Sequence, residues 1–230
     1  MSGPCARYRS GVGAVNGADW RTWRRQTRRE LIAARRALST DERAARKGVI
    51  DGLLERGFKP LGGSSIGFCW PFAAEPEPRF AVRRWRAAGS RAALPCVVAP
   101  RMPLEFREWW PGVVMTAGVY GIPSPQDTPL LAPEAMLMPV NGFDRHGYRL
   151  GYGGGYFDRT LAAMPHEPLK IGLGYELARL DTIMPQSHDI PLDAIVTEAG
   201  IEWRIDGVLQ SVDEDQAAIE LNARLAAGWT

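Results

Sequence analysis

The chain has 230 residues, 45% of them hydrophobic and 23% charged, which excludes a disordered chain and leaves room for one substantial core. Its formal net charge of +2 excludes the basic excess typical of proteins that bind polyanions. Three scattered cysteines indicate no disulfide framework or thiolate metal site and favour a reducing compartment. We therefore expect a cytoplasmic monomer with no nucleic-acid or membrane partner. Residues 1–18 predict a flexible N-terminal extension, and residues 19–230 a single domain.

Two helices are expected first in chain order. Apolar side chains recur three or four positions apart from Trp20 to Leu38, and arginines occupy the rest of that surface. Ser39 and Glu42 then have the spacing of a capping box, which predicts a second helix. This helix should run to about Arg56, where Gly57 is expected to end it through a left-handed turn.

Short apolar runs alternate with helical stretches in the rest of the chain, as in β-α-β units. The expected strands are Ile66–Trp70, Ala93–Ala99, Met136–Val140, Lys170–Tyr175 and Ala194–Thr197. The expected helices are Phe80–Ala88, Tyr156–Met164 and Asp213–Ala226. Strands that are apolar on both faces and separated by helices predict an α/β fold, with a doubly wound, mostly parallel sheet and helices on both faces.

The most informative segment carries four glycines within residues 151–155, just before an expected helix. Such a segment exposes backbone amides that can bind phosphate oxygens at the positive end of the helix dipole. Asp158 in the first turn could hold a magnesium ion that the phosphates carry, and Arg145 and Arg149 could neutralise the remaining charge. The alternative is a plain strand-to-helix turn in which Asp158 is an ordinary helix-start residue.

Other chemical signals are weaker. Gly63-Ser64-Ser65-Ile66-Gly67 has the spacing of a hydrolase nucleophile elbow, but Ser65 precedes a strand instead of following one. The three histidines have no zinc-ligand spacing. The glycine segment also lacks the dinucleotide and P-loop fingerprints, so a nucleotide site here is of another type.

Taken together, the motifs resemble the 5-formyltetrahydrofolate cyclo-ligase family in its bacterial form, from Trp20 to about Trp203. The resemblance is carried by Arg35-Arg36-Ala37-Leu38-Ser39, Ile66-Gly67-Phe68-Cys69-Trp70-Pro71, Glu75-Pro76-Glu77-Pro78-Arg79, Gly121-Ile122-Pro123, the segment from Leu150 to Asp158, and His188-Asp189-Ile190-Pro191-Leu192-Asp193 with Val196-Thr197-Glu198. Each motif is modest, but their order and spacing are jointly specific.

The resemblance implies roles for particular residues. Positions matching ATP contacts are Arg24, Arg28, Arg149, Gly151, Tyr152, Gly153, Gly154, Gly155, Tyr156 and Phe157. Positions matching the folate pocket are Trp70, Glu75, Tyr152, Gly153, Gly154, Gly155 and Tyr156. Asp158 and Asp189 match ligands of Mg²⁺, the implied cofactor, and Arg29 is expected to point away from ATP.

The implied reaction is ATP-dependent conversion of 5-formyltetrahydrofolate to 5,10-methenyltetrahydrofolate, which needs alignment and charge stabilisation instead of a protein nucleophile. Three alternatives stay open. The chain could be a non-catalytic folate- or nucleotide-binding relative. Its arginine-rich first helix could be a solvated face or bind RNA, although no aromatic-basic RNA signature accompanies it. Trp70 could be a core aromatic instead of a stacking platform.

Overall fold

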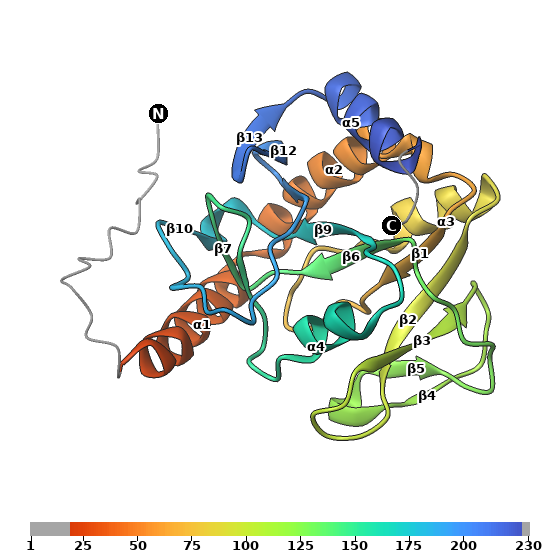
Figure 1. Ribbon diagram of the computed structural model, residues 1–230, viewed down its shortest axis with the longest axis horizontal. Coiled ribbons are helices and arrows are strands. Elements are labelled where there is room, and N and C mark those ends of the chain that lie inside the picture. The colour runs from red at the N-terminus through yellow and green to blue at the C-terminus, as the bar shows by residue number, and fades with distance from the viewer. Residues whose placement is uncertain (1–18, 227–230) are drawn as a thin grey trace.

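The computed structural model describes residues 19–226, so the predicted extension at residues 1–18 lies outside the described residues, as do residues 227–230. An eight-stranded sheet forms the centre of this part of the chain (Figure 1). Its order is β13 (Val208–Val212), β12 (Gly200–Ile205), β11 (Ala194–Thr197), β9 (Leu169–Leu173), β6 (Ala135–Pro139), β1 (Ser65–Phe68), β2 (Arg91–Val97) and β3 (Leu104–Trp109). The run from β11 to β2 is parallel, whereas β3, β12 and β13 pair antiparallel, which confirms the mostly parallel sheet.

The helices lie on both faces of the sheet. They are α1 (Trp20–Ala37), α2 (Thr40–Gly57), α3 (Arg79–Ala87), α4 (Tyr156–Ala163) and α5 (Glu214–Ala226). One core joins α2, α3 and α5 to the sheet through side chains such as Leu54, Val82 and Leu221. A second core lies under α4, on the opposite side of the sheet in Figure 1, and includes Met136 and Met138. None of the helices within residues 19–226 is long and apolar enough to cross a membrane.

Helix α1 packs on a small sheet instead of the large one. This sheet has the order β10 (Arg179–Leu180), β7 (Gly142–Asp144) and β8 (Arg149–Leu150). Leu31 of α1 contacts Leu150, Leu180 and Ile183 in a separate apolar cluster. Because the glycine segment follows β8 directly, this packing brings the arginines of α1 to that segment.

The strand order creates a crevice at one place. Strand β1 comes first in the chain, β2 lies on one side of it, and β6, β9 and β11 follow on the other side. In open α/β sheets, ligands bind outside the carboxyl ends of the strands where the order reverses, here between β1 and β6.

Two details differ from the sequence-based expectation. Gly57 is the last residue of α2 and has no positive φ angle, so the predicted left-handed turn is wrong. A glycine is needed there because a Cβ atom would lie 2.5 Å from Cδ1 of Ile201. The antiparallel edge strands were not predicted, nor was the two-stranded sheet of β4 (Met115–Ala117) and β5 (Pro123–Pro125). Short or half-exposed strands carry a weak apolar pattern, which explains their absence from the prediction.

Candidate functional site

The glycine segment forms an open turn that ends at the first residue of α4. Gly153 and Gly155 have φ angles of 92° and 64°, which L side chains rarely adopt. Gly155 is the N-cap of α4, and no side chain of the described residues caps the helix, so its first backbone amides lack side-chain partners there. Gly154 must also be small, because a Cβ atom would lie 2.8 Å from the Tyr156 ring. This geometry suits an anion at the helix start.

Arg28 brings an unsatisfied cation to this turn. A Cβ atom on Gly153 would lie 3.2 Å from Nη1 of Arg28, so the guanidinium rests against the glycine backbone. The Nε atom of Arg28 is buried and has no hydrogen-bond partner within residues 19–226. Burial, followed by repulsion from Arg24 and Arg25, lowers the pKa of Arg28. A bound anion would satisfy the buried donor and offset this repulsion.

Arg149 and Asp158 form an ion pair on the other side of the turn. Nη1 of Arg149 donates to Oδ1 of Asp158 at 3.1 Å, and the amide of Ile190 donates to the same oxygen at 3.3 Å. Nη2 of Arg149 is buried and makes no hydrogen bond to the described residues. No hydrogen bond from the described residues reaches Oδ2 of Asp158 either. One cationic donor and one carboxylate oxygen are therefore available.

Arg24 and Asp189 bind one another. Arg24 also donates to the carbonyls of Ile183 and Met184, at 2.9 and 2.8 Å, and the amide of Gln186 donates to Asp189 at 2.6 Å. Arg24 thus fastens α1 to the loop that carries Asp189. Both are buried and paired in this arrangement.

Asp158 and Asp189 differ in how well they suit Mg²⁺. Within the described part of the chain, no three His, Cys, Asp or Glu side chains are grouped as for a metal ion. Mg²⁺ commonly binds one or two carboxylates and completes its shell with water and substrate phosphates. Oδ2 of Asp158 fits that requirement beside the glycine turn, whereas Asp189 would have to exchange hydrogen bonds with Arg24 first.

Glu75 is a buried carboxylate that the loop after β1 places against the glycine turn. The Tyr152 hydroxyl donates to its Oε1 at 2.5 Å, and the amide of Phe72 donates to its Oε2 at 2.9 Å. Arg35 donates to the Tyr152 hydroxyl at 3.0 Å and lies 3.8 Å from Glu75. Burial raises the pKa of Glu75, although these contacts oppose the rise. Ala73, which precedes this carboxylate by two residues, has a strained φ of 50°.

Arg35 is a residue of this site that the sequence analysis did not select. A signal for it exists in the spacing of α1, whose buried residues are Arg24, Thr27, Leu31 and Arg35. Intervals of three and four place both arginines on the buried face of the helix, unlike the exposed Arg25 and Arg29 between them.

Two other expected residues have partners of their own. The Trp70 ring packs beside the main core, with the Arg79 guanidinium 4.2 Å from its centroid, so one face of the ring is covered. Arg145 is exposed and donates to His146 at 3.1 Å, and it makes no recorded contact with the glycine turn among residues 19–226. The expectation that Arg145 neutralises charge at that turn gains no support.

A cavity of about 720 Å³ lies beside the Glu75 cluster, between α1 and the loop after β1. Its walls are Arg29, Ile32, Ala33, Arg36, Ala37, Phe72, Ala73 and Tyr152. The volume falls in the range of small-molecule sites, and the wall combines apolar surface with two cations. Arg29, which was expected to point away from ATP, lines this second space together with Tyr152.

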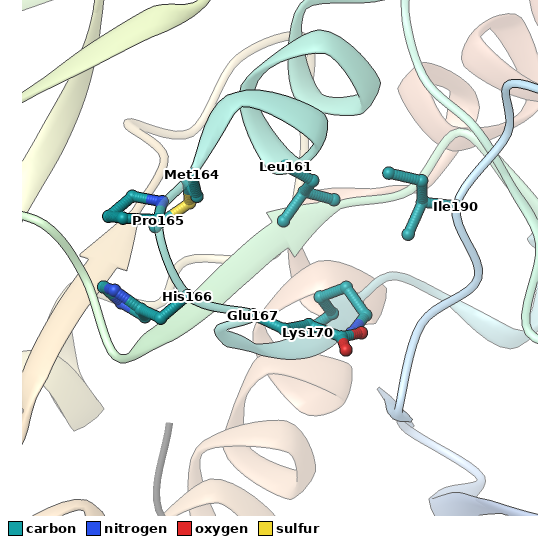
Figure 2. Close-up of a pocket in the computed structure, with 7 residues that line it drawn as sticks. All are labelled: Leu161, Met164, Pro165, His166, Glu167, Lys170 and Ile190. Atoms are coloured by element: carbon teal, nitrogen blue, oxygen red, sulfur yellow. The ribbon is translucent and has the colours of Figure 1, made fainter. Parts of the chain in front are cut away.

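A smaller cavity of about 300 Å³ lies between the end of α4 and β9 (Figure 2). Figure 2 shows Lys170 there beside Glu167, with Leu161 and Ile190 on the opposite wall. Lys170 is buried and pairs with Glu167 and with Asp193, the latter at 3.0 Å. The pair with Asp193 attaches the segment after Asp189 to β9.

Comparison with known proteins gives a consistent result. A family model described as the 5-formyltetrahydrofolate cyclo-ligase family matches residues 21–198. The Escherichia coli K12 5-formyltetrahydrofolate cyclo-ligase is 35% identical over 33% of this chain and 42% of its own length. The aligned part of this chain thus spans less than half of that relative. The Mycolicibacterium smegmatis 5-formyltetrahydrofolate cyclo-ligase is 28% identical over 75% of this chain and 92% of its own.

Two solved structures share the fold. The 5,10-methenyltetrahydrofolate synthetase from Aquifex aeolicus has a TM-score of 0.69 and 23% identity, over 83% of this chain and 96% of its own. The 5,10-methenyltetrahydrofolate synthetase from Mycoplasma pneumoniae has a TM-score of 0.63 and 24% identity, over 76% of this chain and 98% of its own. At this identity the likeness concerns the fold.

Proposed function

The chain belongs to the 5-formyltetrahydrofolate cyclo-ligase family, and from this premise we propose that it converts 5-formyltetrahydrofolate and ATP to 5,10-methenyltetrahydrofolate, ADP and phosphate. The observation that carries the proposal is the glycine turn at the start of α4. It combines helix-start amides that no side chain caps with buried donors of Arg28 and Arg149 that have no partner among residues 19–226. Buried donors without acceptors are costly, and phosphate oxygens would satisfy them.

The folate would occupy the space beside Glu75. A buried carboxylate can accept hydrogen bonds from the N–H donors of a pterin ring, and aromatic side chains offer it flat surfaces. The neighbouring 720 Å³ cavity would take the rest of the molecule, with Arg29 and Arg36 available to its carboxylates. Tyr152 touches both spaces and lies within the glycine turn, so both substrates would meet there.

The chemistry needs two displacements. The formyl oxygen attacks the γ-phosphorus of ATP, and ADP leaves with the electrons of the broken P–O bond. The neighbouring folate nitrogen then attacks the formyl carbon and loses its proton, and phosphate leaves with the former formyl oxygen. Amides of the turn, Arg28 and Arg149 would align and stabilise the transferring phosphoryl group.

Asp158 and Asp189 would hold the magnesium ion that this family implies, with Asp158 contributing its free oxygen. When bound, Mg²⁺ supplies positive charge to the phosphate oxygens. To bind the ion directly, Asp189 would have to leave its ion pair with Arg24. If the pair stays intact, Asp189 would act on the metal only indirectly. We also propose that the enzyme is a cytoplasmic monomer that acts on small molecules, and its formal net charge of +2 argues against a polyanionic partner.

The competing function is a relative that binds folate or nucleotide without turnover. The formation of methenyl-folate, followed by its absorbance with purified protein, 5-formyltetrahydrofolate, ATP and Mg²⁺, separates the two. We expect product only when nucleotide and metal are both present. Binding of both substrates without product would favour the non-catalytic relative, and equal rates without ATP would refute the mechanism.

A further inference from the structure

The hairpin of β4 and β5 carries two large apolar side chains at its tip. Val119 and Tyr120 are 48% and 69% exposed. Tyr120 has a φ angle of 62°, which is unfavourable for a residue with a side chain. The tip is closed by a hydrogen bond from the Gly118 amide to the Ile122 carbonyl at 2.9 Å. An exposed aromatic ring on a strained, closed turn needs an explanation.

The tip touches the candidate phosphate site. The hydroxyl groups of Tyr120 and Tyr156 lie 3.4 Å apart, and Tyr156 is the first residue of α4. The base of the hairpin is held to the large sheet, where Ser124 of β5 bonds Cys96 of β2 at 2.7 Å. The ring of Tyr120 is thus presented beside the start of α4 by an anchored element.

The two ends of the glycine turn face different neighbours. Tyr152 bonds the buried Glu75, on the folate side of the proposed site. Tyr156 bonds Tyr120, on the hairpin side. If phosphoryl transfer occurs between the substrates, the γ-phosphate lies toward Tyr152. The rest of the nucleotide then extends away from Tyr152, and beside Tyr156 at the other end of the turn Tyr120 offers an exposed aromatic surface.

We propose that Tyr120 is a nucleotide-binding residue whose ring stacks on the purine base of ATP. This inference rests on the proposed function, because it takes ATP as the ligand of the glycine turn. It assigns a role to the tip that contains Gly121, a residue of a family motif for which the phosphate chemistry has no use. Purine bases stack on aromatic side chains through their flat faces, so the ring matters more than the hydroxyl.

The experiment measures binding by isothermal titration calorimetry with two ligands, ATP and inorganic tripolyphosphate. Tyr120→Ala should weaken ATP binding by on the order of tenfold and leave tripolyphosphate binding unchanged, because the latter has no base. Tyr120→Phe should bind ATP within about twofold of the wild type, because the ring is kept. Val119→Ala, at the same tip, serves as the matched control, and thermal melting confirms that each variant folds.

The outcomes separate the two proposals. Equal losses for ATP and tripolyphosphate in Tyr120→Ala would mean that the tip supports the phosphate site, and would overturn base stacking. Unchanged ATP affinity in Tyr120→Ala would also overturn it, while the proposed function would stand. Failure of the wild-type protein to bind either ligand would refute the proposed function itself.

Discussion

Replacing Arg28 by methionine should have opposite effects on the stability of the free protein and on its affinity for ATP. Methionine keeps much of the apolar stem but removes a buried donor that has no partner within residues 19–226, and a cation repelled by Arg24 and Arg25. An unsatisfied buried donor costs about 1–3 kcal/mol, and the lower value applies because Arg28 is half-buried. A gain of about 1 kcal/mol should raise the Tm by about 2–4 °C in a chain of this size.

In the presence of ATP, the wild type should instead be more stable than Arg28→Met. Loss of a charge-assisted hydrogen bond to phosphate costs about 1.5–3 kcal/mol, which weakens binding about tenfold or more. ATP at 100 times the wild-type Kd stabilises the wild type by about 2.7 kcal/mol, whereas a tenfold weaker variant gains only about 1.4 kcal/mol. Thermal melts with and without ATP measure both effects together.

Arg25 provides the matched control on the same helix, because it is exposed and contacts neither the glycine turn nor a cavity wall. Arg25→Met should change ATP binding by less than about threefold, which is a field effect at most. A lower Tm without ATP and unchanged ATP affinity in Arg28→Met would refute the reasoning, since Arg28 would then be a structural residue.

Three further predictions follow from the site and the core. Asp158→Asn should keep the fold and lower turnover by on the order of a hundredfold, measured by methenyl-folate absorbance, since the metal-assisted stabilisation is weakened; near-normal turnover would reassign Asp158 to pairing with Arg149. Because burial raises the pKa of Glu75, its protonated form is favoured on folding, so its contribution to stability is greatest below the pKa of unfolded glutamate and is lost as the pH rises through the folded pKa. Urea unfolding across pH 4–8 should therefore show that the free energy of unfolding falls less steeply with rising pH in Glu75→Gln than in the wild type. An equal slope in both proteins would contradict this. Gly57→Ala should destabilise the protein by about 1–3 kcal/mol in the same assay, because its Cβ atom would meet Ile201; Gly48→Ala, with open space at the Cβ position, is the control.

Much of the fold could be predicted because the central strands and helices carry strong local patterns. The boundaries of β11 agree with the prediction, and those of α4 and α5 within one residue. The capping box of Ser39 and Glu42 is present at the start of α2. The parallel strands are buried on both faces, so their apolar runs are unmistakable. The edge strands were missed because one side faces solvent or other elements and weakens the pattern.

The candidate site divides in a similar way. The glycine turn and its helix follow from local composition, because glycine is needed wherever φ is positive. Contacts between residues far apart in the sequence do not follow from local composition. Arg35 approaches Glu75 only because α1 packs on the small sheet, and Arg24 meets Asp189 across 165 residues of sequence.

By itself, the sequence determined the fold class and the family, and it pointed to the glycine segment that we propose binds phosphate, because periodicity, capping and glycine spacing act over a few residues. Only the tertiary structure decided which arginines of α1 are buried, which lack partners and which line a cavity. It also placed Tyr120 beside Tyr156. These outcomes depend on how α1 and the β4–β5 hairpin pack against the rest of the chain, and packing between distant segments has no local signature.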